Sequence, residues 1–201
     1  REEKISFWIN CYNAFTLKLV VDNYPIEPRW YMVTYPDNSI IQIPGAWTKN
    51  YFEVTGLQYN LNEIKNGLLL DRFDDVRIAL ALCNATKSGP FLRKEIYTAR
   101  KLDTQLDEQV KRYIQSKRGM SINTSSNVLN LSNYFMMEKN VFTKFSEVRR
   151  FRTYDEQERA ILNFIYPFLT KEQTEWLEST EFEVNFMKYD WELNEQSKNS
   201  I

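Results

Sequence analysis

The feature that most constrains the fold is the apolar pattern of the first 23 residues. Large apolar side chains recur there at every third or fourth position: Ile5, Trp8, Tyr12, Phe15 and Leu19. This is the spacing of one face of an α-helix. Tyr24-Pro25 ends the pattern, because proline disfavours helical backbone in the residue before it. The sequence therefore predicts a long, mostly buried N-terminal helix over residues 2–23.

Four short segments have the composition of β-strands: residues 40–43, 51–54, 76–83 and 128–132. Pro44-Gly45 and Thr55-Gly56 follow the first two as turns. Residues 76–83 are nearly all apolar, and a buried strand is favoured there, although periodicity alone does not separate a strand from a buried helix.

Further helices are predicted from capping signals and periodicity. Capping-box spacing occurs in three pairs: Asn60 with Glu63, Thr153 with Glu156, and Thr170 with Gln173. The first pair opens a helix through Leu70, and the other two open helices on either side of Pro167. Residues 102–114 carry an apolar residue at every fourth position and predict an amphipathic helix that ends at Arg118-Gly119. Ser132 is the expected N-cap after the last strand.

No composition break, repeat or linker divides the chain. We expect one α+β domain over residues 1–201, in which a small mixed or antiparallel sheet packs against several helices.

Charge and residue counts exclude several classes of function. The 26 basic and 27 acidic residues leave a net charge of -1, so no nucleic acid is expected as a partner. Histidine is absent, which removes Ser-His-Asp and Cys-His catalysis and His-ligated zinc. No metal or other cofactor is expected. No apolar run is long enough for a transmembrane segment. The chain begins with Arg1, and a preceding signal peptide would place the protein in the cell envelope or outside the cell; the compartment stays open.

Six segments, in order, carry a family resemblance: FWINCYNAFTLKLV, NLNEIKNGLL, DVRIALALCNATKSGPFLRKEIYTA, LDTQLDEQVKRYI, VLNLSNYF and YDWELN. From about residue 5 to residue 194 the chain resembles the domain of unknown function family number 547. The resemblance implies reactive His, His and Cys positions, which are Asn66, Ala79 and Gly89 here. It therefore implies a catalytically degenerate copy of a cysteine-hydrolase-like site.

Polar residues that could line a cleft are spread over the chain: Asn10, Asn13, Asn84, Lys87, Ser88, Arg93 and Asp190. Asn10 and Asn13 share one helix face and either bond neighbouring backbone or orient a ligand. Lys87, Ser88 and Arg93 form either a small anion site or a solvated loop. Asp190 either joins the cleft or pairs with a buried arginine, Arg77 or Arg93.

Two further groups are weaker candidates. Cys11 and Cys83 are either core residues, a disulfide or, for Cys11, a nucleophile. The acidic residues Asp71, Asp74 and Asp75 are expected to form a solvated turn rather than a cation site.

Two hypotheses for function follow. The first is a degenerate domain that binds an unknown small ligand or a protein. The second is a His-free hydrolase or transferase that uses Cys11, or Lys87 with Ser88. The oligomeric state stays open.

Overall fold

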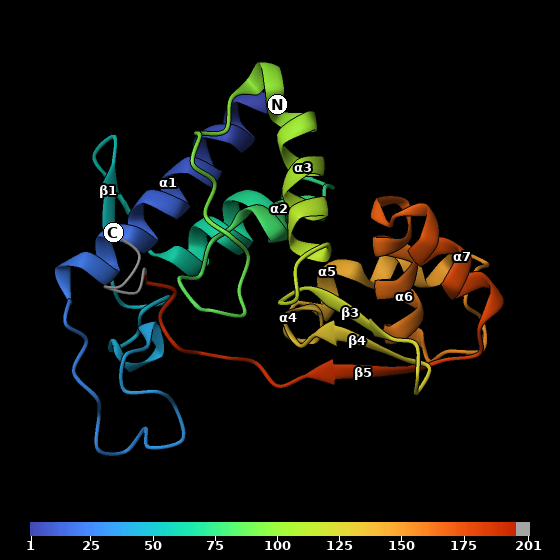
Figure 1. The fold of residues 1–201 in the computed structure, drawn as a ribbon. Coiled ribbons are helices and arrows are strands. Elements are labelled where there is room, and N and C mark those ends of the chain that lie inside the picture. Colours follow the sequence, from blue (N-terminus) through green and yellow to red (C-terminus); the bar gives the residue numbers. More distant parts are fainter. Residues whose placement is uncertain (196–201) are drawn as a thin grey trace. The chain divides into compact units, whose positions relative to one another are not determined.

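The computed structural model describes residues 1–195, which form two compact units (Figure 1). Unit 1 contains Arg1–Leu102 and the described residues that follow Tyr189, and unit 2 is Asp103–Tyr189. Helices and two small sheets make up the chain, which confirms the α+β class. That the units fold as one domain stays a prediction. None of the helices within residues 1–195 has both the length and the apolar character needed to cross a membrane.

Unit 1 is built on helix α1 (Glu2–Asp22), which confirms the predicted N-terminal helix. Its inner face is formed by Ile5, Ile9, Tyr12 and Leu19, each no more than 3% exposed. Two acidic residues in the first turn suit the positive end of the helix dipole. The helix ends at Asp22 with Asn23 as its C-cap, directly before the predicted stop at Tyr24-Pro25.

A small hairpin and a short 3-10 turn follow α1. The predicted strand at residues 40–43 is wrong, because these residues form η1 (Ile40–Gln42), in which the Ser39 hydroxyl accepts a hydrogen bond from the Ile41 N–H. Strand β1 (Phe52–Val54) is confirmed and pairs antiparallel with β2 (Leu57–Tyr59). The predicted turn between them has positive φ at both Thr55 and Gly56, which suits the twist of a tight hairpin.

The next helices of unit 1 are η2 (Glu63–Leu70), α2 (Arg77–Ala81) and η3 (Ala99–Lys101). The capping box that opens η2 is confirmed: the Glu63 N–H donates to Asn60 Oδ1, and the Asn60 N–H donates to Glu63 Oε2, both at 2.9 Å. The strand predicted for residues 76–83 is wrong, because α2 occupies its centre. Ile78, Ala79 and Leu80 are fully buried. A helix buried on every side shows no apolar period, so its run of apolar residues looks like a strand.

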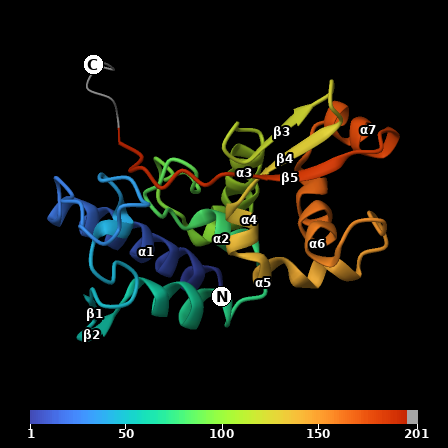
Figure 2. The same cartoon turned by 90° about the horizontal axis from the view of Figure 1, so that it is seen from below.

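Unit 2 opens with α3 (Leu102–Ile114), the predicted amphipathic helix. Its mixed sheet contains β3 (Met120–Asn123), β4 (Val128–Ser132) and β5 (Glu183–Met187) in that order (Figure 2). The β3–β4 pair is antiparallel and the β4–β5 pair is parallel.

The other helices of unit 2 are α4 (Tyr134–Met137), α5 (Lys139–Phe142), η4 (Thr143–Glu147), α6 (Glu156–Ile165), η5 (Tyr166–Phe168) and α7 (Lys171–Ser179). The rings of Phe135, Phe142 and Phe164 join this unit's core.

Two of the three helix caps expected in unit 2 need correction. The N-cap of α6 is Asp155 rather than Thr153, because its carboxylate accepts two backbone hydrogen bonds at 2.8 Å. The N-cap of α4 is Asn133 rather than Ser132, although the Ser132 hydroxyl accepts a hydrogen bond from the Tyr134 N–H. The capping box of Thr170 and Gln173 is confirmed.

Candidate functional site

Asn10 and Asn13 project from α1 and bond two distant backbone segments. Asn10 donates to the Tyr97 carbonyl at 2.8 Å and accepts from the Tyr97 N–H at 2.9 Å. Asn13 donates to the Ala81 carbonyl at 3.0 Å and accepts from the Cys83 N–H at 2.8 Å. Each amide therefore uses both its oxygen and its nitrogen to hold a backbone segment that is distant in the sequence. This is the structural role that the sequence left as one of two alternatives.

The polar loop after α2 is ordered by its own side chains. Asn84 Oδ1 accepts hydrogen bonds from the Thr86 hydroxyl at 2.8 Å and the Thr86 N–H at 3.4 Å. The Gly89 N–H donates to Thr86 Oγ1 at 3.1 Å. A Cβ at position 89 would lie 1.8 Å from Asn84 Oδ1. The loop therefore has no room for a side chain at the position where the family resemblance implies a cysteine.

An extended segment, residues 190–195, docks along this loop, and we call it the strap. Four backbone hydrogen bonds hold it: Lys87 N–H to Glu192 O, Ser88 N–H to Asp190 O, Leu193 N–H to Asn38 O and Asn194 N–H to Ala85 O. Thr86 and Leu193 form an antiparallel bridge. The strap is therefore held by strand-like backbone pairing.

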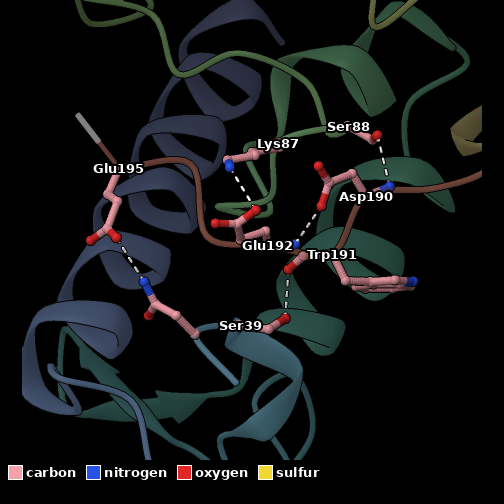
Figure 3. A network of polar contacts seen from close by, with 8 residues as sticks. Ser39, Lys87, Ser88, Asp190, Trp191, Glu192 and Glu195 are labelled. Atoms are coloured by element: carbon pink, nitrogen blue, oxygen red, sulfur yellow. Dashed lines mark hydrogen bonds and ion pairs between the residues drawn. The ribbon is translucent and has the colours of Figure 1, made fainter. Parts of the chain in front are cut away.

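Side chains reinforce the docked strap (Figure 3). Lys87 Nζ lies 2.6 Å from Glu192 Oε2, and the Ser88 hydroxyl accepts from the Asp190 N–H at 2.9 Å. Ser39, which is fully buried, donates to the Trp191 carbonyl at 2.6 Å. Lys87 and Ser88 thus contact different strap residues, and a Lys-Ser catalytic dyad is not formed.

Two acidic residues of the strap raise the pKa of the groups that bind them. The hydrogen bond to Glu192 raises the pKa of Lys87 above its ordinary value. The Tyr24 hydroxyl donates to Glu195 at 3.0 Å, and this bond raises the pKa of Tyr24. Asn38 Nδ2 donates to the other oxygen of Glu195 at 2.8 Å. A lysine with a raised pKa stays charged at neutral pH, which suits an ion pair and not a nucleophile.

The partner predicted for Asp190 is wrong. Its side chain is exposed, and its Oδ1 accepts a hydrogen bond from the Glu192 N–H at 2.9 Å. Arg77 instead forms an ion pair with Asp75 at 2.8 Å. Within residues 1–195, no three acidic or thiol side chains gather closely enough to hold a metal ion.

The two cysteines form no disulfide with each other. Cys11 is half-buried, and burial raises the pKa of its thiol. Cys83 is 5% exposed, and its sulfur accepts a hydrogen bond from the Ala85 N–H. A raised pKa lowers the thiolate fraction at neutral pH, so Cys11 has the character of a packing residue.

Unit 1 contains two neighbouring pockets. The first, of about 340 Å³, is mostly apolar and is lined by Leu17, Val20, Tyr24, Cys83, Ala85, Leu92, Leu193, Asn194 and Glu195. The second, of about 290 Å³, is lined by Asn10, Asn13, Ala14, Leu17, Leu92, Arg93, Lys94, Glu95, Ile96 and Tyr97.

The two pockets adjoin one another along α1. Leu17 and Leu92 line both of them. The α1 residues that line them fall on one helical stripe: 10, 13, 14, 17 and 20. At 1.5 Å per residue this stripe is about 15 Å long. Tyr24, which follows the helix, lines the apolar pocket. We call the two pockets together the α1 groove. Both expose mostly apolar surface. The pocket at the Asn10 end also has three charged residues in its lining, residues 93–95, and for these we call it the polar pocket; the other is the apolar pocket.

The structure divides the predicted site residues into two groups. Asn10, Asn13 and Arg93 line the α1 groove, whereas Asn84, Lys87 and Ser88 order the loop or contact the strap, to which Asp190 itself belongs. Cys83 lines the apolar pocket, and Cys11 lines neither pocket.

The groove's apolar residues were not predicted. Leu17 and Val20 lie outside the buried stripe of α1, and this second apolar stripe is the signal that could have found them. Leu92 and Leu193 offered no such signal.

Comparison with known proteins gives one match. The family model described as "Protein of unknown function, DUF547" matches residues 1–114, a narrower range than the resemblance over about residues 5–194. Searches of curated proteins and of solved structures find no match. The matched range includes α1, the loop after α2 and most of the groove lining; it excludes the strap.

Proposed function

Because the chain belongs to the DUF547 family of proteins of unknown function, its role must be argued from its own site, and we propose that it is a non-catalytic domain that binds an elongated small molecule in the α1 groove. Two pockets lie along the α1 stripe from Asn10 to Val20 and share the lining residues Leu17 and Leu92, and this is the observation that carries the proposal.

The size and lining of the groove support a small-molecule ligand. Ligand pockets usually enclose about 300–1,000 Å³ and are mostly apolar with a few polar groups. The apolar pocket is about 340 Å³, and the polar pocket adds about 290 Å³. Leu17 is 44% exposed, so an apolar ligand would remove apolar surface from water.

The chemistry of the nearby polar groups favours binding over catalysis. Asn10 and Asn13 each make two backbone hydrogen bonds, and Lys87 is ion-paired with Glu192. The alternative, a hydrolase or transferase, needs an activated thiol or hydroxyl. Burial raises the pKa of Cys11, which is unfavourable for that role.

The test is binding of N-phenyl-1-naphthylamine, a neutral apolar dye that fluoresces when it leaves water. Leu17→Glu places a charge where the two pockets meet and should weaken dye binding about tenfold or more, because a carboxylate is costly to desolvate. Val21→Glu is the matched control: Val21 is on the same helix, is 70% exposed and lines neither pocket.

We expect the unaltered protein and Val21→Glu to bind the dye equally. Absence of saturable binding to the unaltered protein, or equal binding by Leu17→Glu, contradicts the proposal. Circular dichroism shows whether each variant is folded.

A further inference from the structure

The two ends of the α1 groove carry opposite charge. Arg93, Lys94 and Glu95 line the polar pocket, and their formal charges sum to +1. Among residues 1–195, Glu195 is the one charged residue in the lining of the apolar pocket. A ligand that fills the groove therefore meets net positive charge beside Asn10 and negative charge beside Tyr24.

Hydrogen bonds with Asn10 hold the backbone at the positive end. We call Asn10 and Asn13, each with the two backbone groups that it bonds, the asparagine clamps. Asn10 fixes the backbone of Tyr97 through two hydrogen bonds, and the Tyr97 side chain is 2% exposed. The Arg93 guanidinium lies 5.9 Å from the centre of the Tyr97 ring, which is cation–π range. Asn10 is in this sense a positioning residue for Arg93.

Lys94 supplies a second cation at the same end. It is exposed, and none of the ion pairs among residues 1–195 includes it. The guanidinium group of arginine and the ammonium group of lysine are the usual partners of carboxylate, sulfate and phosphate groups. The two cations thus suit a single anionic group at the polar end.

The lining of the pocket at the negative end is mostly apolar, with Glu195 as its charged residue. The Glu195 carboxylate accepts hydrogen bonds from Tyr24 and Asn38, which keep it at the pocket. A second anion there would be repelled, whereas Val20, Leu92 and Leu193 offer an apolar surface. The uncharged end of a ligand is therefore favoured at this position.

We propose that the ligand class of the α1 groove is an amphipathic anion: an alkyl or other apolar chain that ends in one carboxylate, sulfate or phosphate group. The anionic group lies at Arg93 and Lys94, and the chain lies along Leu17, Leu92 and Leu193. This inference rests on the proposed function, since it specifies what the same groove binds.

The experiment compares three compounds with the same alkyl chain as competitors of N-phenyl-1-naphthylamine: decanoate, decanol and decyltrimethylammonium, each below the concentration at which it aggregates. Decanoate should displace the dye at concentrations about fivefold lower than decanol, the factor that one partly exposed ion pair provides. Decyltrimethylammonium should be the weakest competitor. Added salt should reduce the preference for decanoate because it screens exposed charges.

Substitutions of the two cations test whether they cause the preference for decanoate over decanol. Lys94→Gln and Arg93→Gln should each bring decanoate toward the affinity of decanol and leave decanol unchanged. Lys4→Gln, on the exposed side of α1 and in neither pocket lining, is the control and should keep the preference. Since Lys94 is exposed, its replacement leaves the fold intact.

The outcomes separate the two claims. If all three compounds displace the dye equally, the groove binds apolar ligands but the proposed class is wrong. A preference for decanoate that survives both substitutions also overturns this proposal. If the dye does not bind in the first place, the proposed function fails and this inference fails with it.

Discussion

In unit 1, asparagine side chains supply hydrogen bonds of the kind that paired backbone segments supply in a sheet. Asn13 is 6% exposed and joins α1 to the Ala81 carbonyl and the Cys83 N–H, which are 68 and 70 residues away in the sequence. Ala81 is the last residue of α2, and Cys83 follows its C-cap, Leu82. The Asn13 amide therefore supplies hydrogen-bond partners to the backbone at the end of α2.

Removal of either clamp should destabilise the fold. Asn13→Ala leaves buried donors and acceptors unpaired, so we expect the free energy of unfolding to fall by about 1–3 kcal/mol. Asn10→Ala should cost a similar amount, toward the lower end because Asn10 is only half-buried. Chemical denaturation measures both.

Asn66→Ala is the control for the clamps, since the Asn66 side chain bonds Asn62 at the surface. Its effect should stay within about 0.5 kcal/mol. If Asn13→Ala is no more destabilising than Asn66→Ala, the clamp is not a stabilising contact.

Two glycines of unit 1 should respond in opposite directions to the same change. Gly89→Ala puts a Cβ 1.8 Å from Asn84 Oδ1 and should lower the free energy of unfolding by about 1–3 kcal/mol, because Asn84 must leave Thr86. Gly67→Ala meets no atom within 4 Å and should raise it by about 0.5–1 kcal/mol, because alanine restricts the unfolded helix segment. Urea titrations measure both variants. A Gly89→Ala protein as stable as the unaltered chain would show that the loop has room for a side chain at position 89.

At the scale of elements, the strap is held by both buried and exposed contacts; the hydrogen bond from Ser39 to the Trp191 carbonyl is among the buried ones. Its side-chain contacts with Lys87 and Tyr24 are exposed, although its backbone pairs with the loop after α2. Exposed ion pairs contribute little stability individually. The strap therefore depends on several weak contacts that act together.

Alkaline pH should loosen the strap. The folded-state pKa values of Tyr24 and Lys87 are raised above their ordinary values of 10.0 and 10.5 by Glu195 and Glu192. A group whose pKa is raised by folding stabilises the folded state fully below its ordinary pKa. This stabilisation is lost as the pH rises through the raised pKa. We expect the strap to stay docked at neutral pH and to loosen only above about pH 10.

The fluorine NMR signal of Trp191, in protein labelled with fluorotryptophan, reports this transition, because Trp191 packs against Tyr35 and Trp47. Lys87→Met removes the Lys87 contribution and should weaken the pH dependence. Release of Trp191 between about pH 6 and pH 8, where neither group titrates, would contradict this account.

The elements that could be predicted are those specified by local chemistry. The capping boxes at Asn60 and Thr170 determine where η2 and α7 begin, because their hydrogen bonds join residues three apart. The apolar period of α3 predicts a helix with one buried face. By contrast, α2 is surrounded by unit 1, and its apolar run carries no period to distinguish helix from strand.

At the scale of the whole chain, the α1 groove is assembled from distant parts of the sequence. Its lining comes from α1, from residues 83–97 and from the strap, and the chain passes through all of unit 2 between the last two. The family match ends at residue 114, so the strap's contribution lies outside the matched range.

This assembly explains why only part of the candidate site could be predicted. Asn10, Asn13 and Arg93 stood out as polar residues in apolar surroundings. Leu193 completes the apolar pocket only because backbone hydrogen bonds place the strap there, and such pairing leaves no local signal. Lys87 and Ser88 stood out for catalysis but contact the strap, which sequence spacing does not reveal.

The most direct test of the central claim is where a bound amphipathic anion attaches. An alkyl carboxylate with a photoreactive diazirine near the end of its chain would be cross-linked to the protein and the adduct located by mass spectrometry. We expect adducts on Val20, Leu92 or Leu193, reduced by excess decanoate. Adducts confined to residues 103–189, or labelling that decanoate does not reduce, would contradict the account.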